Sequence, residues 1–374
     1  MTQPISPLCT IVPPYLLDRL AGLGHEGALR SRQLDAALRA ARAAQATPPP
    51  DGEQQAGEQR GGEQRGGERR AGEQPAAGPA AAAGVTGRPG RTIADAEHTE
   101  HLPGRAMRTE GGPPTADPSV NRAYDGLGAT LALLLEVYGR RSVDGAGLPL
   151  HATVHYGTGY DNAFWDGRRM VFGDGDGTIF GDFTGCPDVI GHELAHGLVQ
   201  YSTKLAYHGQ PGALNESVAD VFGTLAKQYA LGQQADDADW LIGAGLFGSG
   251  VRGVALRSLK APGTAYDDPR LGRDPQPGSM DGYVETDEDE GGVHINSGIP
   301  NRAFQLLAAD LGGAAWERAG RIWYDTVTGP ELRPDADFAA FARATVTAAR
   351  TRFGEGPVPE AVAGAWKRVG LSAT

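Results

Sequence analysis

The chain has 374 residues, 40% of them hydrophobic and 21% charged, which is long enough for two packed domains. Its 34 Lys and Arg against 46 Asp and Glu give a net charge of -12, and this argues against binding to a nucleic-acid backbone, which needs a basic surface. No run of 18 apolar residues is present, so no membrane-spanning helix is expected.

Residues 1–45 are interpreted as a small element of their own. The spacing of Leu34 and Leu38 fits one face of a helix, and a piece this short is expected to dock on a larger body. No basic region precedes an apolar one at the N-terminus, so no Sec signal peptide is predicted. The two cysteines, Cys9 and Cys186, are too few for a disulfide scaffold, and reduced thiols are expected, with a single bridge as the alternative.

Residues 46–90 contain an imperfect five-residue repeat of Gly, Glu, Gln and Arg without large apolar side chains. Nothing in the repeat offsets the entropy of ordering it, so we predict a disordered linker. After it, strand patterns such as that of His151–Tyr156 are present up to about residue 186, and helical patterns dominate from there to the C-terminus. This order predicts an α+β protein with two lobes.

The sharpest motif is His192-Glu193-Leu194-Ala195-His196. Two histidines four residues apart lie about one turn apart on one helix face, so both imidazoles can bind one cation. Neutral imidazole suits Zn²⁺, and a catalytic zinc site needs three protein ligands and one position left for water. Glu193 lies on an adjoining face, where its carboxylate can take a proton from that water. Because so short a motif also arises by chance, a third ligand is needed.

Glu216 is the expected third ligand, twenty residues after His196 in a second helical pattern. Pro211-Gly212 is interpreted as the break between the two helices, and an antiparallel pair brings Glu216 back beside the histidines. Asp220, one turn further along the same face, can accept a hydrogen bond from an imidazole N–H. A solvated helix face for Glu216 and Asp220 is the alternative.

A resemblance to the thermolysin-like metallopeptidases, the gluzincin group, is carried by residues 192–225, HELAHGLVQYSTKLAYHGQPGALNESVADVFGTL. It continues upstream in NAFW (162–165) and MVFGDGDG (170–177), and downstream in GGVHINSG (291–298). The resemblance implies the thermolysin-like two-lobe fold. Its strand-rich N-terminal catalytic lobe would span residues 91–190 and its helical C-terminal lobe residues 191–374, with the active-site cleft between them.

This resemblance implies a zinc-dependent neutral endopeptidase with one catalytic Zn²⁺. The zinc ligands would be His192, His196 and Glu216. Glu193 would act as the general base and then as the general acid, and Asp220 would orient His192.

It further implies that His294 and Tyr207 donate to the oxyanion of the tetrahedral intermediate, with Asp289 orienting His294. Donors aimed at the developing negative charge are what amide hydrolysis needs. Without the resemblance, His294 would be interpreted as an ordinary histidine of a Gly-rich loop.

The substrate-binding positions are also implied by the resemblance. A large apolar pocket favours a bulky hydrophobic residue just after the scissile bond, while Asn162 would bind the substrate backbone and Arg257 a substrate carbonyl. Considered without the resemblance, apolar residues of this kind more often belong to the core. The full set is Asn162, Ala163, Phe180, Phe183, Val189, Ile242, Leu256 and Arg257.

Thermolysin-type enzymes also bind a pair of structural calcium ions through clustered carboxylates. Asp188 and Asp239 match that cluster, but Lys227, Leu241 and Ala244 stand where the family carries glutamates. Ca²⁺ needs 6–8 oxygen ligands, and a lysine replaces the cation's charge with its own. We therefore predict that the paired calcium site is absent.

Residues 10–17, TIVPPYLL, resemble the short propeptide of the protealysin subgroup, so residues 1–45 are predicted to be a propeptide and the chain a zymogen. Maturation is expected between residues 60 and 110. Cys9 leaves two alternatives open: its thiolate fills the open zinc position and keeps the zymogen silent, or it is an inert small residue beside the Pro-Pro turn.

Two rival functions are a catalytically silent, zinc-stabilised binding protein and a metal-dependent hydrolase of another substrate. The first is disfavoured because Glu193, Tyr207 and His294 are present although metal retention does not require them. The expected partners are protein or peptide substrates and the chain's own propeptide, without nucleic acid or membrane, and a monomer is expected. The expected location is outside the cell without a Sec signal, with the cytoplasm as the alternative.

Overall fold

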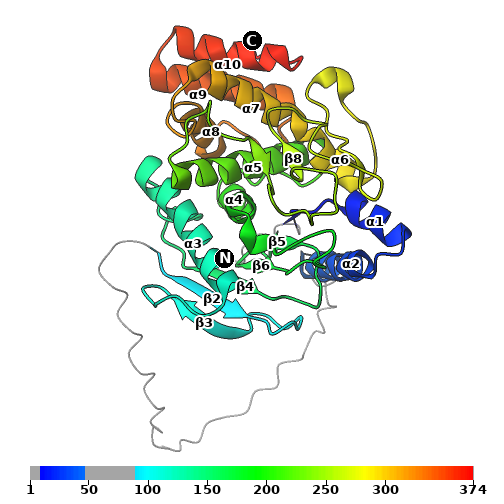
Figure 1. Ribbon diagram of the computed structural model, residues 1–374. Helices are drawn as coiled ribbons and strands as arrows, with labels where there is room; N and C mark the ends of the chain where they lie inside the picture. Colours follow the sequence, from blue (N-terminus) through cyan, green and yellow to red (C-terminus); the bar gives the residue numbers. More distant parts are fainter. Residues whose placement is uncertain (1–8, 47–88, 374) are drawn as a thin grey trace, which may run out of the picture.

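The computed structural model describes residues 9–46 and 89–373 (Figure 1). The predicted disordered linker falls almost wholly on residues 47–88, which lie outside the described residues. Among the helices of the described part, none is both long and apolar enough to cross a membrane.

A six-stranded mixed sheet forms the N-terminal lobe, with β4 parallel to both β2 and β6 and the other neighbours antiparallel. Five of its strands come from the predicted catalytic lobe. The sixth, β1, belongs to the N-terminal segment and lies at the edge beside β5, with Cys9 opposite Trp165. In sheet order the strands are β1 (Cys9–Thr10), β5 (Ala163–Trp165), β6 (Met170–Phe172), β4 (Leu150–Val154), β2 (Arg91–Asp95) and β3 (Arg105–Thr109).

Helices dominate the C-terminal lobe, as predicted (Figure 1). Helix α3 (Pro118–Ala132), with its π-helical end η1 (Leu133–Val137), belongs to the first lobe and contacts α4. The others are α4 (Pro187–Gln200), α5 (Gly209–Leu231), α6 (Asp289–Asn296), α7 (Gly298–Leu311), α8 (Ala319–Thr328), α9 (Phe338–Phe353) and α10 (Pro357–Arg368). Short 3-10 turns are η2 (Phe183–Gly185) and η3 (Met280–Gly282). Two small ribbons that the sequence did not indicate pair β7 (Leu241–Ile242) with β8 (Arg257–Ser258), and β9 (Asp267–Asp268) with β10 (Gly272–Arg273).

One expectation about local structure is wrong. Pro211-Gly212 does not separate two helices, because α5 already begins at Gly209. A proline in the first turn is tolerated, since the first N–H groups of a helix have no intrahelical partner. His294 lies near the end of α6, and the glycines just before it, Gly291 and Gly292, are not helical.

Close packing of α4 against α5 brings the two zinc-site helices together, and it depends on glycine. A Cβ added at Gly223 would lie 2.5 Å from the carbonyl oxygen of Asp188, and one at Gly191 would lie 3.0 Å from the Cα of Gly223. Only residues without a side chain allow this approach. The close crossing sets the distance between the histidines of α4 and Glu216 of α5.

The N-terminal segment folds into β1, α1 (Pro14–Gly22) and α2 (Glu26–Ala46) and contacts both lobes. On α2, Leu34 and Leu38 pack against a buried apolar cluster that includes Tyr160 and Phe164. Arg19 of α1 donates to the backbone carbonyl of Arg270 at 2.9 Å. The expectation that this short piece docks on a larger body is therefore confirmed.

A buried carboxylate, Asp35 of α2, lies in this interface. It accepts hydrogen bonds from the Tyr160 hydroxyl and, at 2.9 Å, from Nδ2 of Asn162. Burial raises the pKa of Asp35 to about 6, against the opposing effects of Tyr160, Arg39 and Asn162.

Docking of the N-terminal segment is therefore expected to weaken as the pH rises. The docked state holds a proton on Asp35 that the released segment, with an ordinary Asp pKa near 3.8, gives up, so docking is tightest below about pH 4 and weakens through pH 6. Between pH 5 and 7 the change amounts to about tenfold in the opening equilibrium. Hydrogen-exchange protection of the α2 amides, corrected for intrinsic rates, measures this change. Equal protection at both pH values, or an unchanged pH dependence in Asp35→Asn, would contradict it.

Candidate active site

The two histidines of α4 and Glu216 of α5 meet with their polar atoms converging. Nε2 of His192 lies 3.1 Å from Nε2 of His196 and 3.5 Å from Oε2 of Glu216, and Nε2 of His196 lies 3.6 Å from Oε1 of Glu216. In a tetrahedral zinc site with ligand distances of about 2.0–2.1 Å, ligand atoms are separated by about 3.3–3.4 Å. The three side chains therefore fit one Zn²⁺.

Each imidazole is held through its other nitrogen. Nδ1 of His192 donates to Oδ1 of Asp220 at 2.8 Å, and Nδ1 of His196 donates to Oδ1 of Asn215 at 2.9 Å. Burial lowers the pKa of both histidines to about 4, so both are neutral at pH 7. Nε2 of each ring is therefore an acceptor directed at the shared position, as a metal ligand requires.

Asp220 is shared by several donors. Nε and Nη2 of Arg257 donate to it at 2.9 and 2.8 Å, and Nδ2 of Asn301 donates to it at 2.8 Å. Burial alone raises the pKa of Asp220. The Arg257 and His192 side chains nevertheless hold this pKa well below its ordinary value. The carboxylate therefore stays charged and fixes the orientation of His192.

Glu193 is fully buried, and neither of its carboxylate oxygens makes a hydrogen bond of good geometry with the described residues, although the Trp165 backbone is close enough to lower its pKa slightly. Burial, and then the charge of Glu216, raises the pKa of Glu193 well above its ordinary value. A carboxyl group with a raised pKa can both accept and return a proton near neutral pH. Buried polar groups without partners are rare in folded proteins, so these oxygens indicate a functional group.

Tyr207 and His294 form the opposite side of the site. The Tyr207 hydroxyl donates to Oε1 of Glu216 and lies 3.4 Å from Nε2 of His294. Nδ1 of His294 donates to Oδ1 of Asp289 at 2.6 Å, and the His294 backbone N–H donates to Oδ2 at 2.8 Å. Burial alone lowers the pKa of His294. The negative charges of Asp289 and then Glu216 outweigh this effect and raise the pKa.

This arrangement requires an unusual backbone before His294. Asp289, Glu290, Gly291 and Gly292 have φ values of 54°, 52°, 81° and 75°, all in the left-handed region. Strained non-glycine residues of this kind concentrate at functional sites.

The N-terminal segment enters the site as an extended chain. The Thr10 carbonyl oxygen lies 3.1 Å from Nε2 of His294. The next residue, Ile11, donates its N–H to the Ala163 carbonyl at 3.1 Å and accepts from Nη1 of Arg257 at 3.0 Å.

Val12 follows in the same register. Its N–H donates to Oδ1 of Asn162 at 2.9 Å, and its carbonyl accepts from Nδ2 of Asn162 at 3.3 Å. Three of the expected substrate-binding positions, Asn162, Ala163 and Arg257, thus hydrogen-bond to an extended peptide in the structure itself.

The five apolar residues expected to form the substrate pocket are all buried. They and Ile11, whose exposed fraction is 0%, are parts of the large apolar core that extends through both lobes. These residues are Phe180, Phe183, Val189, Ile242 and Leu256.

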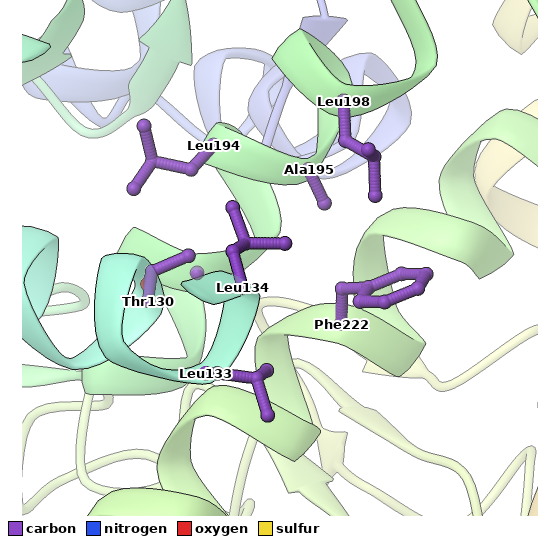
Figure 2. A pocket seen from close by; sticks show the side chains of 8 residues that line it. Thr130, Leu133, Leu134, Leu194, Ala195, Leu198 and Phe222 are labelled. Atoms are coloured by element: carbon purple, nitrogen blue, oxygen red, sulfur yellow. The ribbon is translucent and has the colours of Figure 1, made fainter. Parts of the chain in front are cut away.

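A small apolar pocket lies elsewhere, between α3 with η1, α4 and α5 (Figure 2). From α4 it is lined by Gly191, Leu194, Ala195 and Leu198. At about 100° per residue these positions face away from His192 and His196. This pocket is therefore separate from the metal-ligand cluster.

Lys227 lies at the position where the paired calcium site of the family is predicted to be absent. Its Nζ donates to Oδ2 of Asp188 at 2.7 Å, to Oδ1 of Asp239 at 2.8 Å and to the Leu241 carbonyl at 2.9 Å. Although burial alone lowers it, Asp188 and Asp239 raise the pKa of Lys227. One ammonium group thus donates to oxygens of all three residues.

Three side chains that support the site were missed by the sequence interpretation. Asn215 holds His196, Asn301 holds Asp220, and Nε2 of Gln276 donates to the His294 carbonyl at 2.7 Å. Asn215 directly precedes Glu216, so its position on α5 was the only available signal. Asn301 and Gln276 lie far from their partners in the sequence and carry no such signal.

Comparisons with known proteins agree with this geometry. Residues 112–200 match the family model "Thermolysin metallopeptidase, catalytic domain", and residues 203–371 match "Thermolysin metallopeptidase, alpha-helical domain". The chain is 45% identical over 365 residues to an extracellular metalloprotease of Pectobacterium carotovorum, covering 98% of this chain and 97% of that protein. It is 40% identical over 225 residues to thermolysin of Alicyclobacillus acidocaldarius, covering 58% of this chain and 39% of that protein.

A solved structure is similar as well. The precursor of protealysin, a metalloproteinase from Serratia proteamaculans, aligns with a TM-score of 0.81 at 46% identity. The alignment covers 97% of this chain and 100% of that one, so it includes the N-terminal segment.

Proposed function

From the premise that this chain belongs to the thermolysin metallopeptidases and is protealysin-like, we propose how its site hydrolyses peptide bonds. The chain is a zinc metalloendopeptidase made with a propeptide. We assign the zinc to His192, His196 and Glu216. The separations of 3.1–3.6 Å between their polar atoms are the observation that supports this assignment most directly.

A bound Zn²⁺ supplies a Lewis acid and lowers the pKa of a water molecule. Glu193 takes a proton from the attacking water and passes it to the leaving amine. Its buried, unpartnered carboxylate supports both roles.

The carbonyl oxygen that becomes negative receives hydrogen bonds from Nε2–H of His294 and from the Tyr207 hydroxyl. The 3.1 Å contact between Nε2 of His294 and the Thr10 carbonyl supports this position. Asp289 keeps His294 protonated and fixes its orientation. Asp220 fixes the orientation of His192, which stays neutral. Each oxyanion donor in such a site is worth about 10²–10³ in rate.

We propose further that the enzyme prefers a bulky hydrophobic residue just after the scissile bond. Residues 10–12 serve as a stand-in for substrate: Ile11 would occupy the position after the bond, and its side chain is fully buried. Burying a side chain of that size is worth about 1.5–3 kcal/mol, or about 10- to 150-fold in kcat/KM.

Quenched peptides that differ only in this residue test the proposal. The processed enzyme is expected to cleave the Leu and Phe peptides with a kcat/KM about 10- to 150-fold above that of the Ala peptide. Cleavage should stop with 1,10-phenanthroline and return with Zn²⁺. A zinc-loaded protein that cuts none of the peptides would favour the silent binding protein instead, and equal rates would refute the pocket assignment.

We also propose the domain bounds, the location and the oligomeric state of the chain. We place the propeptide at residues 1–45 and the catalytic lobes at 91–190 and 191–374, and we expect action outside the cell as a monomer. The lysine contacts at Asp188 and Asp239 support the absence of a paired calcium site.

A further inference from the structure

The Thr10–Ile11 peptide bond lies where the proposed function places a scissile bond. Its carbonyl oxygen faces Nε2 of His294, its N–H donates to the Ala163 carbonyl, and Arg257 binds the carbonyl of the following residue. The strand runs antiparallel to β5, and all these contacts follow from that register. By its main-chain contacts alone, this segment is held as a substrate would be.

Cys9, the preceding residue, lies beside two of the three proposed zinc ligands, His196 and Glu216. Its Sγ, one imidazole nitrogen of His196 and one carboxylate oxygen of Glu216 all lie within 4.8 Å of one another. The thiol is 1% exposed, and the pairing of Cys9 with Trp165 across β1 and β5 fixes its position.

Two carboxylates near the thiol have buried oxygens that accept no hydrogen bond of good geometry from the described residues. Oε2 of Glu216 and both oxygens of Glu193 are buried and have no hydrogen-bond partner within the described ranges 9–46 and 89–373. A divalent cation bound by His196, Glu216 and Cys9 together would give Oε2 of Glu216 a partner.

We propose that the Cys9 thiolate takes the fourth coordination position of the zinc in the zymogen, and that the Thr10–Ile11 bond escapes hydrolysis for this reason. The inference rests on the proposed function, because it takes His192, His196 and Glu216 as the other ligands. Four protein ligands make a closed zinc site, whereas catalysis needs one position for water. The thiol releases its proton to solvent when it binds, since only the thiolate is a ligand.

Cobalt substitution tests the ligand directly, without any activity measurement. The full chain is prepared with Glu193→Gln, so that it cannot process itself, and its zinc is replaced by Co²⁺. A thiolate ligand gives a sulfur-to-cobalt charge-transfer absorption, which is expected in this chain, lost with Cys9→Ser and retained with Cys186→Ser. Cys186 is a matched control because it is also buried and its Sγ contacts the Ala244 carbonyl instead.

Self-cleavage tests the consequence. With Glu193 intact, the Cys9→Ser and Cys9→Ala zymogens should hydrolyse the Thr10–Ile11 bond at least tenfold faster than the wild-type zymogen. Water adds across the bond to leave a carboxyl group on Thr10 and an amino group on Ile11, so mass spectrometry identifies the new N-terminus. Cys9→Ser nearly preserves the size of the side chain and guards against misfolding of Cys9→Ala.

The outcomes separate this inference from the proposed function. A cobalt-loaded chain without the charge-transfer absorption, or equal cutting of the Thr10–Ile11 bond with and without Cys9, refutes the inference while metal binding and peptide cleavage stand. Failure to bind any Co²⁺ or Zn²⁺ refutes the proposed function itself.

Discussion

Replacing Glu193 by Gln is expected to lower peptide hydrolysis by about 10²–10⁴ while one zinc ion per chain is retained. Gln keeps the size and hydrogen-bonding shape of the side chain but cannot accept the proton of the attacking water. The zinc is retained because Glu193 is not one of the three converging ligands.

The experiment compares initial rates on a quenched peptide with metal content by mass spectrometry. Both chains are first cut by trypsin within residues 47–88, which contain Arg60, Arg65, Arg69 and Arg70, and are freed of the N-terminal fragment. Glu317→Gln, the same change at an exposed position, is the control and should leave the rate unaltered. A Glu193→Gln enzyme within a few-fold of the wild-type rate would overturn the mechanism.

Lys227→Met is expected to lower the free energy of unfolding by about 3–5 kcal/mol. The substitution removes the ammonium group but leaves Asp188, which is 1% exposed, as a buried carboxylate without its counter-charge. Burial already raises the pKa of Asp188 against the opposing effect of Lys227, so the loss of the lysine raises it further.

Urea unfolding monitored by tryptophan fluorescence measures the change. Lys367→Met, at an exposed position of α10, is the matched control and should change stability by no more than about 0.5 kcal/mol. In the wild type, Ca²⁺ and EGTA should leave the unfolding midpoint unchanged if the lysine has replaced the calcium pair. A Lys227→Met chain as stable as the control would show that the ammonium group does not hold this cluster together.

The metal-ligand cluster could be predicted from sequence because its residues are close together and periodic. His192 and His196 are one helical turn apart, and Glu216 and Asp220 repeat that spacing on the next helix. For these residues local spacing carries the information. Lys227 was singled out by the resemblance to the thermolysin family instead, and the absence of a paired calcium site stays a prediction.

The course of the N-terminal segment could not be predicted. The pairing of Thr10 with Phe164 and the contact of its carbonyl with His294 join residues more than 150 positions apart, and no periodicity records such a register. The start of α5 was missed for a different reason. Proline is unfavourable inside a helix but acceptable in its first turn, so Pro211 alone does not distinguish the two.

The covered edge of β5 has a consequence for the processed protein. When β1 is removed, the backbone groups of Ala163 that pair with Ile11 become part of an exposed sheet edge. Exposed edges pair readily with other extended strands, including that of a neighbouring molecule. We expect the processed enzyme to self-associate through this edge more readily than the full chain, in which β1 covers it.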